Sequence, residues 1–135
     1  MENRAEVELL VNQEALNDLS KRVIGCALIV AGTLGTGFAE RIYEAALAHE
    51  LRKTGLLVAQ QRRISVWYDN VNIGDFTVDL LVEDDLLVEL KAVRALEDTH
   101  RGQCLNYLKA TGLRLCLLLN FGTPRLEIKR VVRGL

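Results

Sequence analysis

The chain has 135 residues, half of them hydrophobic and 26% charged, which describes one globular domain over residues 1–135 rather than a disordered polymer. Its net charge of -1 argues against binding duplex nucleic acid mainly through bulk positive charge, although a local basic groove stays open. No apolar run reaches the roughly 18 residues of a membrane span, and the acidic N-terminal stretch has no signal-peptide core. We therefore expect a cytoplasmic protein with no membrane partner.

The first half of the chain predicts two amphipathic helices. Apolar residues recur at helical spacing over 14–31, and Gly32, Gly35 and Gly37 are expected to end that helix. A second helix is predicted over 38–54, with Gly55 in the position that commonly follows a helix end. The acidic N-terminal helix could pack against a second copy of the chain, so a homo-oligomer is one expectation.

The second half predicts strands around one further helix. The expected elements are a strand over 57–68, a turn at Asp69-Asn70, a hairpin of two strands over 76–92, a helix over 99–111 capped by Asp98 and ended by Gly112, and strands over 113–120 and 126–132. The order α-α-β-β-β-α-β-β predicts an α/β fold with a mixed central sheet flanked by helices. Three cysteines without CxxC spacing predict neither zinc nor disulfides, but small core residues.

Charged residues interrupt the apolar hairpin. Period-two alternation places Phe76, Val78, Leu80 and Val82 on one face of the first strand and Asp79 on the other face. On the second strand, Glu89 and Lys91 share a face. Carboxylates and an ammonium on apolar strands are costly to desolvate unless something needs them there. A divalent cation between the carboxylates, with the lysine beside it, is one such need.

The loop of this hairpin decides whether those charges meet. A two-residue loop at 84–85 would put Asp79 and Glu89 on opposite faces, whereas a loop over 83–85 opposes Asp79 to Glu89. A loop over 84–86 opposes Asp79 to Lys91. The metal interpretation therefore predicts an odd loop or a bulge. The alternative is an exposed face with scattered charges, and the spacing alone does not choose between the two.

A second polar group lies on the predicted helix over 99–111. His100, Gln103 and Tyr107 recur at spacings of three and four, so they share one side, while Leu105 and Leu108 suit the core. Such a stripe is commonly the solvated face of a helix. The functional interpretation is that Gln103 and Tyr107 look into a cleft and hold a phosphate or a catalytic water.

Several short motifs follow one another in a specific order. They are G-x-x-E-x-x-Y at Gly37, Glu40 and Tyr43, D-(x)n-E-x-K at Asp79, Glu89 and Lys91, and Q-x-x-x-Y at Gln103 and Tyr107. From about Val23 to Val132 the chain resembles the GxxExxY protein family, within the PD-(D/E)XK nuclease superfamily. Gln103 and Tyr107 match the additional motif of the RecB-like and lambda-exonuclease-like branches. Val78 stands where the superfamily's name motif has proline, which leaves the following carboxylate in place.

The resemblance implies a restriction-endonuclease-like core and a metal-dependent nuclease that hydrolyses phosphodiester bonds, with DNA expected rather than RNA. It implies that Asp79 and Glu89 bind Mg²⁺ or Mn²⁺, with the Leu90 carbonyl as a third ligand and Glu40 completing the site. Lys91 would orient the attacking water, and the Q-x-x-x-Y residues would position the water or the nucleic-acid backbone. The alternative is a nucleic-acid-binding or protein-interaction module that keeps this fold without turnover.

Overall fold

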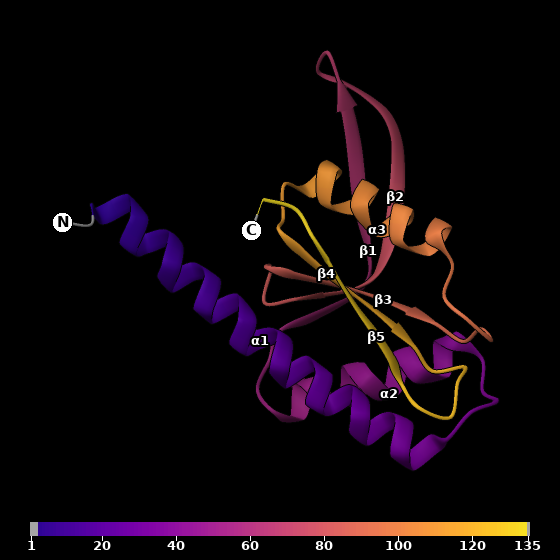
Figure 1. Ribbon diagram of the computed structural model, residues 1–135. Coiled ribbons are helices and arrows are strands. Elements are labelled where there is room, and N and C mark those ends of the chain that lie inside the picture. The colour runs from indigo at the N-terminus through magenta and orange to yellow at the C-terminus, as the bar shows by residue number, and fades with distance from the viewer. Residues whose placement is uncertain (1–2, 135) are drawn as a thin grey trace.

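The computed structural model describes residues 3–134, and its elements follow the predicted order (Figure 1). The elements are α1 (Arg4–Leu34), α2 (Glu40–Lys53), β1 (Val58–Tyr68), β2 (Val71–Val82), β3 (Leu86–Lys91), α3 (Asp98–Thr111), β4 (Leu115–Asn120) and β5 (Glu127–Val132). The strands form one sheet in chain order. Only β3 and β4 pair in parallel, and α3 is the crossover between them. The predicted α/β fold with a mixed sheet is therefore confirmed.

Helix α1 is longer than its apolar periodicity predicted. It begins at Arg4, where the Asn3 side chain accepts a hydrogen bond from the Glu6 N–H at 2.9 Å and caps the first turn. Residues 4–12 are all exposed, so no buried face marks this part of the helix in the sequence (Figure 1). The helix also continues through Gly32 and ends at Gly35, which has a φ of 66°. The expectation that Gly32 breaks the helix was wrong.

The sheet is covered on both faces. Helices α1 and α2 pack on one face, where Leu47 and Leu51 belong to the same buried cluster as Val88 and Leu117. Helix α3 packs on the other face. The buried cluster on this side contains Leu87, Cys104, Leu108, Cys116 and Leu118. The three cysteines are free and buried, as the sequence predicted. Within residues 3–134, no helix has both the length and the apolar character needed to cross a bilayer.

The loop between β2 and β3 has the odd length that the metal interpretation requires. The strands pair Val82 with Leu86 and Leu80 with Val88, so three residues connect them. Glu83 and Asp84 have φ values of 54° and 55°, which lets the chain reverse within this short loop. Continuing the same register by one residue sets Asp79 across from Glu89. The predicted odd loop is confirmed, and of the two alternatives it is the one over 83–85.

Strand β2 does not keep one face throughout, and the predicted single apolar face was wrong. The Phe76 ring contacts Tyr107 of α3, and Val78 belongs to the cluster beneath α3. Leu80 and Val82 belong instead to the cluster beneath α1 and α2. The pairing register of β1 with β2 is the same on both sides of Asp79, so no residue is inserted. The change of face coincides with Gln61 on β1, across from Asp79, which has a left-handed φ of 50°.

Helix α3 differs from its prediction at the start. Its N-cap is Glu97 rather than Asp98, and the His100 ring accepts a hydrogen bond from the Glu97 N–H at 3.0 Å. His100 therefore fixes the first turn of the helix. The helix ends as predicted at Gly112, whose φ of 74° satisfies the geometry of a left-handed cap.

Candidate active site

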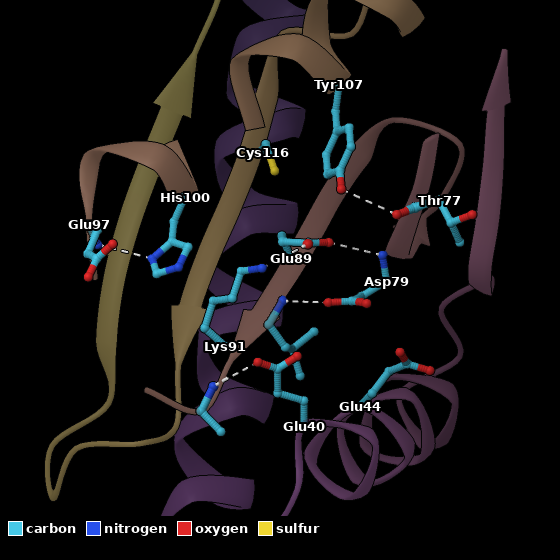
Figure 2. A network of polar contacts seen from close by, with 12 residues as sticks. Glu40, Glu44, Thr77, Asp79, Glu89, Lys91, Glu97, His100, Tyr107 and Cys116 are labelled. Atoms are coloured by element: carbon cyan, nitrogen blue, oxygen red, sulfur yellow. Dashed lines mark hydrogen bonds and ion pairs between the residues drawn. The ribbon is translucent and has the colours of Figure 1, made fainter. Parts of the chain in front are cut away.

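The predicted acids meet where β2 and β3 part. Beyond the Leu80 and Val88 pair the strands no longer bond through their backbones alone. The Asp79 N–H donates to the Glu89 carboxylate at 3.2 Å, and the Leu90 N–H donates to the Asp79 carboxylate at 2.8 Å (Figure 2). Each acid is therefore held by the strand that carries the other. This exchange fixes the two carboxylates next to one another where the two inner strands separate.

The electrostatics of Glu89 show that this pair lacks positive charge. Glu89 is only 4% exposed, and burial, followed by the negative charge of Asp79, raises its pKa to about 8. The Asp79 N–H and the Lys91 ammonium, 3.6 Å from a Glu89 oxygen, offset only part of this rise. A cation between the two acids would relieve both the burial cost and the repulsion.

The oxygen donors present fit a hard cation that keeps part of its water. Within residues 3–134, no group of three Asp, Glu, His or Cys side chains converges as a metal cluster, so Glu40 does not join Asp79 and Glu89 directly. Mg²⁺ is commonly held by one or two carboxylates with waters in its remaining positions. Two adjacent carboxylates are therefore a suitable donor set.

Glu40 lies beside the end of β3 because Tyr43 holds the loop before α2 in place. The Tyr43 hydroxyl donates to the Gly35 carbonyl at 2.5 Å and accepts from the Phe38 N–H at 3.3 Å. Its buried ring stacks on Phe121 at 4.8 Å. Glu40 begins α2 and accepts a hydrogen bond from the N–H of Ala92, the residue after β3, at 3.3 Å. The G-x-x-E-x-x-Y spacing thus places an acid beside the end of β3.

Asn120, which the sequence interpretation did not assign to the site, clamps the chain that follows Lys91. Its amide is fully buried, accepts from the Val93 N–H at 3.0 Å and donates to the Val93 carbonyl at 2.9 Å. Gly122 lies against the same segment, and a side-chain carbon there would be 2.2 Å from the Val93 oxygen. The polar residue that ends the apolar run at 115–120 was the available signal.

Gln103 and Tyr107 do not lie on a fully solvated face of α3, one of the two alternatives that the sequence left open. Tyr107 is 2% exposed, its hydroxyl donates to the Thr77 carbonyl at 3.3 Å, and burial raises its pKa (Figure 2). This side chain ties α3 to β2 two residues before Asp79. Gln103 is half-buried. Within residues 3–134 it makes no hydrogen bond to Asp79 or Glu89.

Two further residues join the site, and the sequence did not assign either of them. The Gln61 amide donates to an Asp79 oxygen at 3.1 Å and also to Glu44. Glu44 lies one turn after Glu40 on α2, and its second oxygen accepts from Gln60 at 3.0 Å. Gln61 therefore bridges the carboxylates of Asp79 and Glu44. Adjacent glutamines on a strand carry no signal of a left-handed residue, so sequence could not single Gln61 out.

We predict that the left-handed backbone at Gln61 can be separated from its amide contact. Gln61→Gly and Gln61→Ala both remove the amide, but only glycine adopts a φ of 50° without strain. We expect the glycine variant to be more stable than the alanine variant by about 1 kcal/mol in urea unfolding. At Gln60, in the regular strand, the matched pair should reverse the order. Equal stabilities at position 61 would contradict a strained backbone there.

Comparisons with known proteins concern the family and the fold of the chain. A family model described as the PD-(D/E)XK nuclease superfamily matches residues 17–131. The solved structure of SSO0001 is 15% identical with a TM-score of 0.57, covering 70% of this chain, which spans 50% of that one. An alkaline exonuclease from Laribacter hongkongensis is 17% identical with a TM-score of 0.41, covering 80% of this chain and 76% of its own. No curated protein matches the chain. The structure of SSO0001 shows a similar fold. Because the family model matches residues 17–131, the chain belongs to the PD-(D/E)XK nuclease superfamily.

Proposed function

We propose that the protein is a metal-dependent nuclease that hydrolyses phosphodiester bonds of DNA, using Mg²⁺ or Mn²⁺. The observation that carries the proposal is the mutual fixing of two acids: Asp79 bonds the backbone of β3, and Glu89 bonds the backbone of β2. Membership of the nuclease superfamily supports hydrolysis of nucleic acid. The resemblance to the GxxExxY family, and to branches that share the Q-x-x-x-Y motif, favours DNA over RNA.

Asp79 and Glu89 would hold the cation, with the Leu90 carbonyl as a third ligand and Glu40 bound through a water. When bound, the ion polarises the scissile phosphate and lowers the pKa of a coordinated water. Gln61 keeps one Asp79 oxygen oriented by donating to it, while the Leu90 N–H orients the other. The carboxylates are thus directed before substrate arrives, which lowers the reorganisation that the reaction requires.

Lys91 would orient the attacking water and offset charge that develops on the phosphoryl oxygens. Its side chain is 16% exposed, and little water therefore screens its charge. Tyr107 would act as a positioning residue, because its hydroxyl donates to the Thr77 carbonyl two residues before Asp79. Gln103 would contact the nucleic-acid backbone from the cavity that it lines beside Phe76.

The test combines cleavage with metal binding. We expect the wild-type protein to cleave labelled DNA only with Mg²⁺ or Mn²⁺ present, and Asp79→Asn to lose cleavage and most of its Mn²⁺ affinity in calorimetry. Asp75→Asn is the matched control, because Asp75 lies on the same strand but pairs with Arg63 at 2.6 Å. If the protein cleaves neither DNA nor RNA, single- or double-stranded, with either ion, the proposed nuclease function is refuted. Mn²⁺ binding unchanged by Asp79→Asn would refute the metal site.

A further inference from the structure

Helix α3 lies beside the β1–β2 hairpin (Figure 1), and residues of both line a groove. It consists of three cavities, each sharing lining residues with the next. The first, of about 470 Å³, lies beside Gln103 and Phe76, and the second, also of about 470 Å³, lies between Phe76 and Trp67. The third, of about 390 Å³, lies beside Trp67 and Arg62. The fourteen residues of α3 span about 21 Å, so the groove is elongated rather than a pocket for one small molecule.

The side chains of this groove combine aromatic rings with unpaired cations. Trp67 is 63% exposed and Phe76 is 36% exposed, so both rings have accessible surface. Among residues 3–134, Lys109 and Arg62 have no ion-pair partner, and the Asn106 amide has no hydrogen-bond partner. Asp84 is the one acid that lines any of the three cavities within the described chain. Rings for stacking and cations for phosphate suit a single-stranded nucleic acid.

Contacts of Tyr107 link the groove to the candidate active site. The Phe76 ring meets the Tyr107 ring edge-on, with centroids 5.5 Å apart. The Tyr107 hydroxyl in turn donates to the Thr77 carbonyl, two residues before Asp79 (Figure 2). Tyr107, which contacts a ring that lines the groove, therefore also helps to place the first acid of the site.

We propose that this groove binds the strand that is cleaved, as single-stranded nucleic acid, with a base stacked on Trp67 and phosphates beside Lys109 and Arg62. The proposal rests on the proposed nuclease function and names its substrate as a single strand. Bases in a duplex already stack on one another, whereas bases of a single strand are free to stack on a protein ring. A net charge of -1 also leaves recognition to local cations and rings rather than to bulk charge.

The chain provides its own probe, because Trp67 is its only tryptophan. We expect an oligothymidylate of about twelve nucleotides, titrated in EDTA so that no cleavage occurs, to quench Trp67 fluorescence saturably. Phe76→Leu should weaken binding by about fivefold or more through lost stacking. Lys109→Ala should reduce the slope of log affinity against log salt by about 0.7, the value for one phosphate of a single strand. Lys129→Ala, an exposed change on β5, should leave both quantities unchanged.

Three results would overturn the groove. They are no quenching by the oligonucleotide, equal affinity for a duplex of the same length, and a Trp67 emission that shifts with protein concentration alone, which would mean that a second copy covers the groove. The nuclease proposal is tested separately. Saturable quenching without cleavage in Mn²⁺ would support the groove and refute the nuclease. Cleavage by Trp67→Leu at the wild-type rate, without oligonucleotide quenching of the wild-type protein, would refute the groove and leave the nuclease standing.

Discussion

Replacing Lys91 with methionine is expected to reduce the rate of DNA cleavage by about 10²- to 10³-fold, the cost of removing one preorganised electrostatic group from an active site. Methionine keeps the length of the side chain but removes the ammonium, which lies 3.6 Å from Glu89 at the end of β3. Since Lys91 supplies no oxygen ligand, Mn²⁺ affinity should remain or increase as a competing positive charge disappears. The measurement is a single-turnover rate at saturating Mn²⁺, beside a calorimetric titration of the same sample.

The control for this variant removes a lysine that is also paired but exposed. Lys53→Met loses a contact of 3.1 Å to Glu50 on α2, and the rate should stay at the wild-type value because exposed pairs contribute little. A Lys91→Met variant that cleaves within a few-fold of wild type would remove Lys91 from the chemistry. A variant that loses both cleavage and Mn²⁺ binding would instead show that Lys91 shapes the metal site.

Elements with a buried face were predictable from the sequence. The apolar run that became β4 is buried along its whole length, and the periodic part of α1 carries Leu16, Val23 and Val30 inward. Burial selects apolar residues, so the pattern records which side faces the core. The first turns of α1 have no such face, and only the Asn3 and Glu6 cap marks where the helix begins. A pattern of burial cannot reveal a helix that nothing covers.

The centre of the site was predictable for a different reason. Side chains alternate along strands, so the length of one loop determines whether Asp79 and Glu89 lie on the same face of the hairpin. The three-residue loop brings them together. Glu44 and Gln61 depend on how α2 packs over the sheet and on one left-handed residue, and neither leaves a mark in the sequence. Tyr107 was assigned to the right helix, but helical spacing does not say which side faces the sheet, so the sequence left its environment open and the structure buries it.

The stability of the metal-free protein should fall as pH rises, because of Glu89. The usual pKa of 4.5 for this carboxyl rises to about 8 in the folded chain, through burial and the charge of Asp79. Below the lower value both states hold the proton, so the favourable contribution is complete. Between the two values the unfolded chain releases the proton while the folded chain keeps it, and the free energy of unfolding decreases. Above the higher value both states are ionised and the contribution has been lost.

A Glu89→Gln variant should lack this pH dependence, because glutamine can still accept the Asp79 N–H but carries no charge. With each pKa unit equal to about 1.4 kcal/mol, the variant should exceed wild type by a few kcal/mol near pH 8 to 9 and match it near pH 4. Urea unfolding in EDTA across this range measures the difference. Glu8→Gln, an exposed change on α1, should follow wild type throughout. Parallel profiles for Glu89→Gln and wild type would mean that Glu89 ionises as an ordinary surface acid. The repulsion that we expect a cation to relieve would then be absent.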